Sequence, residues 1–280
     1  MISRRTLLAA ACTALPAFGK RKFSAPVGLE IYSLRGEAEK DLPGTLSTIA
    51  KFGFKEVEVS TLYGRSAAEF QRLLDGAGLK ATSMMAEYGR LAKEIDSVAA
   101  DAHALGAEYV VCGSIPHKKQ FTVEDCDRAI GEFEVWGESL ANAGLHYCYH
   151  AHGFEFGKSE DGTLFDTLVK RTDPKHVNFE MDIFWIVFAF QDPAKMLHRY
   201  PGRFPLMHLK DMRKDTVRGG SPGDVLEEAS VPLGAGIVDI PAVLRAAQKT
   251  GVRHYYIEDE AVDAVRQIPD SLRYLESVRI

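Results

Sequence analysis

Short runs rich in β-branched and aromatic residues alternate along the chain with longer segments in which apolar residues recur every three or four positions. The short runs are typical of β-strands and the longer segments of amphipathic helices. Between residues 42 and 52, for example, Leu42, Leu46, Ile49 and Phe52 share one helical face. The alternation continues from Val27 to the end of the chain and predicts repeated strand–helix units.

Eight strands are predicted, and helical patterns lie between them. The strands are expected at Val27–Ser33, Glu56–Ser60, Lys80–Met85, Tyr109–Gly113, His146–Ala151, His176–Asp182, Leu206–Lys210 and His254–Glu258. The helical patterns include Leu42–Phe52, Ala67–Gly76, Ile95–Leu105, Glu124–Ala143, Thr163–Arg171, Ile240–Thr250 and Val265–Val278. Eight units in about 255 residues match an α/β fold of the (β/α)8 TIM barrel type.

Glycines punctuate this alternation. Gly53, Gly78, Gly106, Gly144 and Gly251 each follow a helical pattern and precede the next strand. Glycine at the residue after a helix accepts the left-handed conformation that ends it. A doubly wound open sheet is the alternative fold, but no glycine-rich phosphate loop follows the first strand. We expect one barrel domain over residues 26–280.

Composition narrows the class of protein without naming a function. The 280 residues are 46% hydrophobic and 26% charged, with 24 Gly and 12 Pro, which is typical of a globular protein and excludes disorder and collagen. The 34 Lys+Arg and 39 Asp+Glu give a formal charge of −5. This acidic balance argues against a nucleic-acid partner, which a basic face would attract.

The first 19 residues are predicted to be an export signal. Arg4 and Arg5 precede an apolar run from Leu7 to Phe18 that is short for a membrane span and resembles a twin-arginine signal. A frayed N-terminal helix is the alternative. Removal of residues 1–19 takes away two positive charges and no negative one, so −5 becomes −7. We expect a periplasmic or exported protein without stable membrane association, or a cytoplasmic one if this interpretation is wrong.

Polar side chains gather where the later strands end. Chemistry in a TIM barrel sits at the carboxyl ends of the strands. Candidates at these ends are Glu58, His150, His152, Asp182, His208, Lys210 and Glu258, and Glu155 follows the fifth strand. Carboxylates and imidazoles without a thiolate suit one divalent cation such as Mn²⁺, Mg²⁺, Co²⁺ or Zn²⁺.

Each of these residues also has an ordinary structural explanation. A single strand histidine is more often a hydrogen-bonded core residue than a ligand, Asp182 before a turn is a potential helix cap, and Glu58 a potential ion-pair partner. Trp185 is as much a core candidate as a substrate platform. The occurrence of such groups at four consecutive strand ends is what favours a metal site.

The segments GLEIYSLR, GFKEVEVS, YHAHGFEF, EMDIFW, PLMHLKDM and HYYIEDE resemble the sugar phosphate isomerase/epimerase family of xylose isomerase-like TIM barrels. The likeness runs in consistent order from Val27 to the C-terminus. That family binds a divalent metal with a Glu-Asp-His-Glu set from strands five to eight. The resemblance implies Asp182, His208 and Glu258 as ligands, with His150 at the strand-five position, or Glu155 in its place.

The resemblance also implies roles for neighbouring residues. Glu58 and Lys210 match positions that face the substrate, and Trp185 is a further substrate-binding candidate. Glu155 and Glu258 are the candidate bases, and Lys210 and His152 would stabilise developing oxyanion charge. Two departures remove polar groups: Met85 replaces a frequent histidine, and Gly234-Ala235-Gly236 lacks the usual central glutamate.

These observations predict a divalent-metal-dependent sugar isomerase or epimerase that abstracts a proton next to the metal-held carbonyl of a keto-sugar or cyclitol. A dehydratase or lyase acting on an inosose or 3-keto-glycoside with the same metal site is the first alternative. A DNA-repair phosphodiesterase of the endonuclease IV kind and a non-catalytic sugar-binding barrel are the others. A homo-oligomer is a further expectation.

Overall fold

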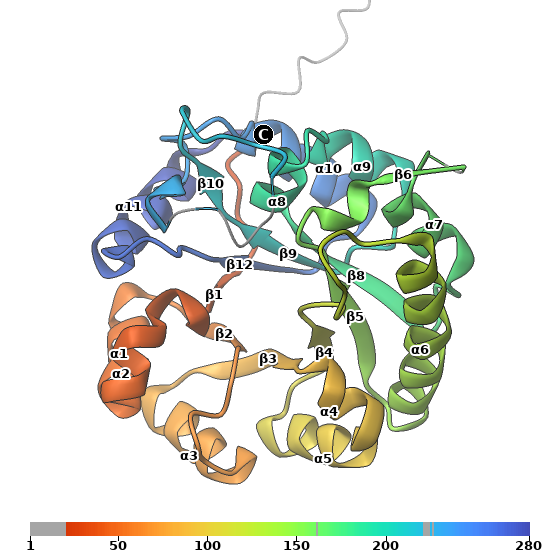
Figure 1. The fold of residues 1–280 in the computed structure, drawn as a ribbon. Helices are drawn as coiled ribbons and strands as arrows, with labels where there is room; N and C mark the ends of the chain where they lie inside the picture. Colours follow the sequence, from red (N-terminus) through yellow and green to blue (C-terminus); the bar gives the residue numbers. More distant parts are fainter. Residues whose placement is uncertain (1–20, 161, 221–224, 226) are drawn as a thin grey trace, which may run out of the picture.

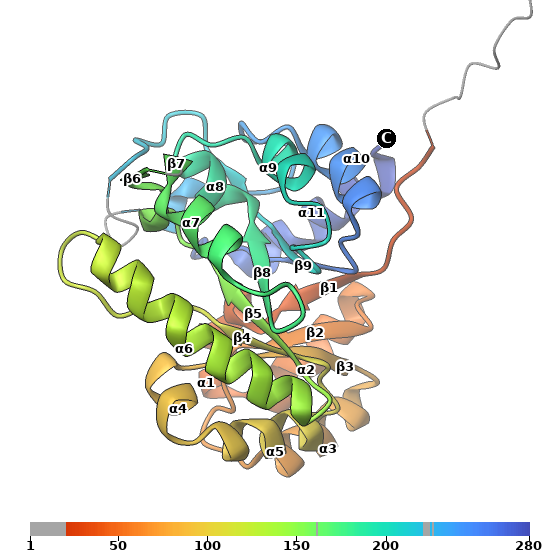
Figure 2. The ribbon, with the colours of Figure 1, turned by 90° about the vertical axis from the view of Figure 1, so that its right-hand side faces the viewer.

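The computed structural model describes residues 21–160, 162–220, 225 and 227–280. The export signal predicted for residues 1–19 lies outside the described residues. Figure 1 looks into the mouth of the barrel, and Figure 2 shows it from the side. The long helix α6 (Val123–Asn142) crosses the flank seen in Figure 2.

Eight parallel strands close into a barrel, which confirms the predicted (β/α)8 fold. The order around the barrel is β1, β2, β3, β4, β5, β8, β9 and β12, with β12 paired back to β1. Their bounds are β1 Val27–Glu30, β2 Glu56–Val59, β3 Lys80–Ala86, β4 Tyr109–Cys112, β5 His146–His150, β8 Val177–Asp182, β9 Leu206–Leu209 and β12 His254–Ile257.

Helices surround this ring of strands (Figure 1). The predicted helices correspond to α2 (Leu42–Phe52), α3 (Ala67–Ala77), α5 (Ile95–Leu105), α6, α7 (Leu164–Arg171), α10 (Ile240–Thr250) and α11 (Ala264–Ser277). Further helices are α1 (Arg35–Lys40), α4 (Tyr88–Lys93), α8 (Ile183–Phe188) and α9 (Pro193–Arg199). These four are short, so their sequences contain too few turns to show a helical period.

Short additional elements lie at the carboxyl end of the barrel strands. Two small antiparallel sheets lie there, β6 (Lys158–Ser159) with β7 (Gly162–Thr163) and β10 (Asp211–Met212) with β11 (Ser230–Val231). The 3₁₀ turn Ile31–Leu34 directly follows β1. A second 3₁₀ turn, Phe154–Phe156, lies a short distance after the end of β5. In Figure 2 the loops after β4, β5 and β9 gather on the left, at one end of the barrel.

Strand alternation divides the barrel into an apolar outer face and a mixed interior. Leu29, Val57, Phe179 and Leu209 are buried in the main core, between the strands and the surrounding helices. A separate apolar cluster of Tyr109, Val111, Cys148, Leu206 and Tyr256 lies on the inward-facing positions. Polar groups therefore remain concentrated at the opposite, carboxyl end of the interior.

Two of the predicted glycine stops show why that residue type is needed. Gly53 after α2 has φ 105° and Gly251 after α10 has φ 94°, both in the left-handed region. An L side chain is strained at such angles, whereas glycine is not. Each glycine thus ends its helix and directs the chain toward the next strand.

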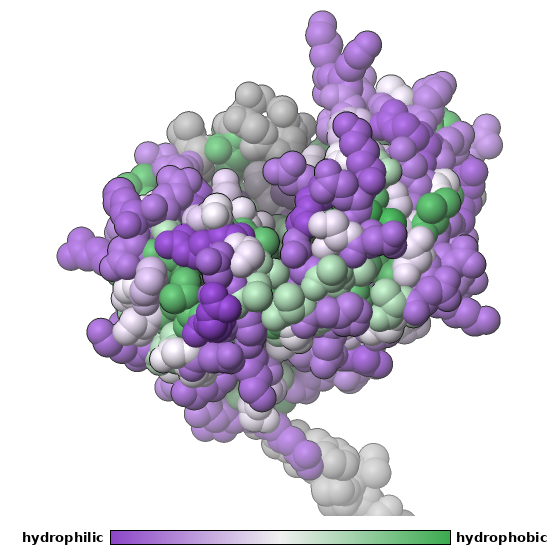
Figure 3. All heavy atoms as spheres, turned by 90° about the horizontal axis from the view of Figure 1, so that it is seen from below, coloured by the Kyte–Doolittle hydropathy of each residue, from purple (hydrophilic) through white to green (hydrophobic). Residues whose placement is uncertain are grey.

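The face seen from below in Figure 3 is mostly hydrophilic, with small separate apolar patches. Among residues 21–160, 162–220 and 227–280, no helix combines the length and apolarity that a membrane span requires.

Helix α6 offers a matched pair of glycines that tests its packing. A Cβ at Gly137 would lie 2.3 Å from the carbonyl oxygen of His176, whereas Gly131 has nothing within 4 Å. We expect Gly137→Ala to destabilise the protein by about 1–3 kcal/mol through overpacking. Gly131→Ala should stabilise it by about 0.5–1 kcal/mol through helix propensity. Urea unfolding midpoints measure both, and equal midpoints for the two variants would contradict this packing.

Candidate active site

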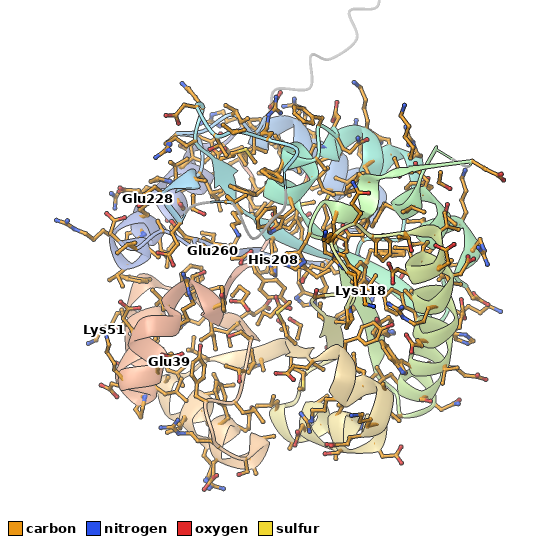
Figure 4. All side chains as sticks on the ribbon, in the orientation of Figure 1. Glu39, Lys51, Lys118, His208, Glu228 and Glu260 are labelled. Carbon is orange, nitrogen blue, oxygen red and sulfur yellow. The ribbon has the colours of Figure 1, made fainter. Side chains whose placement is uncertain are left out.

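Inward-facing ionisable side chains converge at the carboxyl end of the barrel. Figure 4 places His208 and Glu260 near the middle of the ring of strands. The group comes from six strands, β1, β2, β5, β8, β9 and β12, and the residues that directly follow them. None of its members is more than 8% exposed: Glu30, Glu58, His150, Glu180, Asp182, His208, Lys210 and Glu258. Burial of so many charges is favourable only when they compensate one another or hold a cation.

His208 lies among three carboxylates. Its Nε2 is 2.5 Å from Glu58 Oε2 and 3.3 Å from Glu180 Oε2. Its Nδ1 is 2.9 Å from Glu258 Oε2. Burial alone would lower the pKa of His208, but Glu180, Glu58 and Glu258 together raise it well above its usual value. Without a metal, the imidazolium form of His208 therefore supplies positive charge to this cluster.

His150 has the opposite charge state. Burial and the neighbouring His208 lower its pKa to about 3, so the ring is neutral. Its Nδ1 is 2.9 Å from Glu180 Oε2, and its Nε2 is 3.9 Å from Asp182 Oδ2. Donation from Nδ1 to Glu180 leaves a lone pair on Nε2. A carboxylate behind the ring is the usual support of a metal-ligating histidine.

The residues present fit a divalent cation. Asp182 Oδ2 and Glu180 Oε1 are buried and accept no hydrogen bond from the described residues, which is costly for a carboxylate. Ligand atoms of His150, Asp182 and His208 lie within 4.8 Å of one another. With metal–ligand bonds of about 2.0–2.2 Å, the 3.9 Å between His150 and Asp182 suits two ligands of one ion.

Asp182 also has a local role that orients it. Its Oδ1 accepts hydrogen bonds from the backbone N–H groups of Phe184, at 2.8 Å, and Trp185, at 3.3 Å. The carboxylate thus caps α8 with one oxygen and leaves the other toward His150 and Lys210. Burial raises the pKa of Asp182 well above its usual value, so a cation beside it would stabilise the ionised form.

Glu258 and Lys210 complete the cluster as an ion pair. Lys210 Nζ lies 2.5 Å from Glu260 Oε1, 3.4 Å from Glu258 Oε1 and 4.0 Å from Asp182 Oδ2. These carboxylates raise the pKa of Lys210 despite its burial, and it stays an ammonium group. Although burial opposes it, Lys210 and His208 lower the pKa of Glu258 well below its usual value. Glu258 is thus an ionised fourth candidate ligand.

His152 lies between this cluster and the surface. Its ring centroid is 4.6 Å from that of His150 and 5.7 Å from that of Trp185. Burial, followed by His150, lowers the pKa of His152 well below its usual value, so the ring is neutral. Its Nδ1 has no hydrogen-bond partner among the described residues. His152 therefore presents a neutral ring with an unpartnered nitrogen beside His150 and Trp185.

The family is decided by comparison with known proteins. The sequence profile described as xylose isomerase-like TIM barrel matches residues 46–278. The chain belongs to the xylose isomerase-like TIM barrel family.

Individual relatives agree with this assignment. An inosose dehydratase from Bacillus cereus (strain AH820) is 26% identical over 201 residues, which are 64% of this chain and 66% of that protein. A sugar phosphate isomerase/epimerase from Parabacteroides distasonis ATCC 8503 is 24% identical with a TM-score of 0.73, over 97% of this chain and 98% of that one. The IOLI protein with a bound zinc atom is 13% identical with a TM-score of 0.71, over 90% and 98% of the two chains.

The position of Glu155 differs from that expected of a base or ligand. Its Oε1 accepts hydrogen bonds from the Tyr149 hydroxyl and from the His152 N–H at 3.1 Å, and its Oε2 accepts one from the Gly153 N–H at 2.8 Å. Tyr149 points to the outer face of β5, where it packs against Phe133 of α6. Glu155 thus holds the turn that presents His152, and His150 is the strand-five residue within the cluster.

The other expected residues divide between the interior and the rim. Glu58 is fully buried and accepts a hydrogen bond from Ser83 Oγ at 2.6 Å while it contacts His208, so it supports the back of that ring. Trp185 lies at the rim, with its ring 5.2 Å from Lys210 Nζ. Substrate contact by Glu58, Lys210 and Trp185 stays a prediction.

Sequence reasoning missed Glu180 and Glu260. Glu180 is two residues before Asp182 on β8, so the alternation of strand faces already put it on the same side. Nothing local distinguishes Glu260, which reaches Lys210 only because the chain turns after β12. Ala235 stands where the resemblance predicts a glutamate, and its two glycine neighbours are held by Asp211. Asp211 Oδ2 accepts hydrogen bonds from the N–H groups of Gly234 and Gly236, both at 2.9 Å.

Substitution of Asp182 tests the metal site. Asp182→Asn keeps the cap of α8 but removes the charge that a cation would neutralise. We expect the purified wild type to carry about one divalent ion per chain and this variant to carry none, measured by inductively coupled plasma mass spectrometry. Asp96→Asn, on the exposed face of α5, is the matched control and should keep the metal. Full metal content in Asp182→Asn would refute the site.

Glu180 tests the support behind the two histidines. Because Glu180 Oε2 faces both His150 and His208, Glu180→Gln should lower metal affinity about 10–100-fold. Calorimetric titration of the apo protein with Zn²⁺ or Mn²⁺ measures this. Glu138→Gln, on the exposed side of α6, should bind as the wild type does. An unchanged affinity in Glu180→Gln would show that Glu180 does not orient the ligands.

Proposed function

We propose that this chain is a divalent-metal-dependent lyase of a keto-sugar or cyclitol. It would remove a proton next to a carbonyl and expel an oxygen substituent from the following carbon. The observation that carries the proposal is the unpartnered Nδ1 of His152 next to His150, one of the residues that fit a metal. The Lys210 ammonium, held by Glu258 and Glu260, lies in the same cluster. The similarity to an inosose dehydratase supports the same reaction class.

The residues divide the work of such an elimination. His150, Asp182, His208 and Glu258 would hold the cation, which when bound polarises the carbonyl of the substrate. His152 accepts the proton from the carbon next to that carbonyl. The C–H electron pair becomes the new C=C bond as the C–O bond breaks, and His152 returns the proton to the departing oxygen. Atoms and electrons balance, with no oxidant or reductant.

Lys210 stabilises the negative charge that develops during proton removal. Its ammonium group is already held in place by Glu260 and Glu258, so no reorganisation is needed when the charge appears. Phe184 and Trp185 flank Nζ at 5.1 and 5.2 Å from their ring centroids, which limits the access of water to it. Low local polarity strengthens the electrostatic effect of the ammonium.

An isomerase or epimerase would use the same first step. The difference lies in the fate of the proton, which returns to a carbon of the substrate instead of to a leaving oxygen. The similarity to a sugar phosphate isomerase/epimerase favours this second candidate. The two reactions are separated by their products, because only elimination creates a conjugated enone.

Turnover of a keto-inositol in the presence of Mn²⁺ tests the proposal. We expect ultraviolet absorbance from a conjugated enone, abolished by a chelator. His152→Asn should lower kcat about 10²–10⁴-fold, the usual contribution of a general base, whereas His198→Asn on the exposed face of α9 should not. Isomer formation with solvent deuterium and no enone would overturn the lyase in favour of the isomerase. Absence of turnover on every keto-inositol and keto-glycoside would refute both.

A further inference from the structure

A large groove borders the candidate active site and is not used by the proposed reaction. Its volume is about 790 Å³, within the range of small-molecule sites. Its walls come from the loop between β4 and α6, the segment after β5, the end of α8 and the segment after β10. Aromatic rings dominate its apolar surface, namely Phe121, Phe154, Phe156, Phe188 and Phe190.

A row of rings joins this groove to the metal centre. His150 and His152 are 4.6 Å apart, His152 and Phe154 are stacked at 6.5 Å with an interplanar angle of 6°, and Phe154 lies 4.3 Å from His117. Phe154 and His117 line the groove, whereas His150 belongs to the metal centre. His152 therefore lies between the metal centre and the wall of the groove.

The charge of the groove is opposite to that of the metal centre. Lys119 and Lys158 line it, both are exposed, and neither has an ion-pair partner among the described residues. None of the described residues that line the groove is acidic. At the metal centre, in contrast, carboxylates outnumber cations. The groove thus suits an anionic end of a ligand, whereas the metal centre suits a different end that binds the cation.

The backbone of the groove is held in costly conformations. Phe190 has φ 59° and Lys119 has φ 43°, and they are two of the three non-glycine residues in the left-handed region of the described chain. Phe190 is 64% exposed, yet Arg218 lies 4.6 Å from its ring centroid, and Gly219 approaches the ring so closely that a Cβ there would lie 2.5 Å from Cε2. Strain of this kind concentrates at ligand sites.

We propose that this groove binds an anionic, ring-shaped leaving group, so that the substrate is a keto-glycoside whose aglycone is an aromatic ring with a carboxylate. This inference rests on the proposed function and extends it to the other half of the substrate. The keto-sugar ring lies at the cation, the aglycone ring packs on Phe154 and Phe190, and its carboxylate pairs with Lys119 and Lys158.

The elimination then breaks a glycosidic bond instead of releasing water. The proton leaves the carbon next to the ketone for His152, and its bonding pair forms the C=C bond. The bond between the anomeric carbon and the glycosidic oxygen breaks, and His152 protonates that oxygen. The products are an unsaturated keto-sugar and the free aglycone, with atoms and electrons balanced.

Steady-state kinetics on three 3-keto-glucosides test the proposal with the full, metal-loaded protein. We expect kcat/KM to be at least 10-fold higher for the 4-carboxyphenyl glycoside than for the methyl glycoside, mainly through KM, with the phenyl glycoside between them. The double variant Lys119→Gln/Lys158→Gln should lower the ratio of kcat/KM for the 4-carboxyphenyl glycoside to that for the phenyl glycoside at least 5-fold. Phe190→Ala should lower kcat/KM for both aromatic glycosides relative to the methyl one.

Two control variants are matched to these substitutions. Lys249→Gln on α10 and Val135→Ala on α6 replace exposed residues of the same kinds far from the groove lining, and both should keep the wild-type preference. Added salt should reduce the preference for the carboxyl group in the wild type, because exposed charge pairs are screened. Equal kcat/KM for the methyl and carboxyphenyl substrates would overturn the inference.

Binding separates this inference from the proposed function. The unoxidised 4-carboxyphenyl glucoside cannot react, and calorimetry compares its affinity with that of methyl glucoside. Tighter binding of the carboxyphenyl compound, lost in Lys119→Gln/Lys158→Gln, supports the groove even if no substrate is turned over. Equal binding of the two glucosides refutes the groove even if a keto-inositol is turned over.

Discussion

The balance of buried charge at the carboxyl end of the barrel is the constraint on which the rest of the site depends. Carboxylates from β1, β2, β8 and β12 meet inside a closed ring of strands, where water cannot compensate them. His208 and Lys210 supply part of the opposite charge, yet Asp182 and Glu180 each keep one oxygen without a partner. A divalent cation held by His150, Asp182, His208 and Glu258 would supply the missing positive charge and would take the place of the proton on His208.

The barrel makes this arrangement possible because it separates two tasks. Outward-facing residues of each strand pack against the helices and stabilise the fold. The inward-facing residues between the apolar cluster that includes Tyr109 and Tyr256 and the carboxyl end of the barrel contribute little to this main core. The interior can thus tolerate polar groups that an ordinary sheet face would exclude. Glu155 shows the same separation of structural and site residues. It lies on the outer side of β5 and accepts hydrogen bonds from the backbone of the turn that carries His152.

The loops after β4, β5 and β10 extend the site in one direction. They add aromatic rings and lysines next to an acidic centre, and His152 stands at the boundary between the two. A reacting group at the cation and a charged ring in the groove would thus contact surfaces of opposite sign. The barrel framework is shared with the family, whereas these loops belong to the less regular part of the chain, where substrate selection is usually located.

The sequence by itself determined the barrel, because eight strand patterns and repeated glycine stops depend only on local periodicity and backbone conformation. α2, α5 and α10 have the predicted bounds. It also determined that His150, Asp182, His208, Lys210 and Glu258 share one end of the barrel, since all five lie at the carboxyl ends of predicted parallel strands. Alternation along each strand then fixes the face on which each side chain lies. Export through residues 1–19 stays a prediction. Only the tertiary structure decided that Glu155 turns outward to Tyr149, that Glu180 supports both histidines and that Glu260 reaches Lys210. These contacts join different strands or follow turns after a strand, and their geometry depends on barrel closure and loop paths that no local pattern encodes.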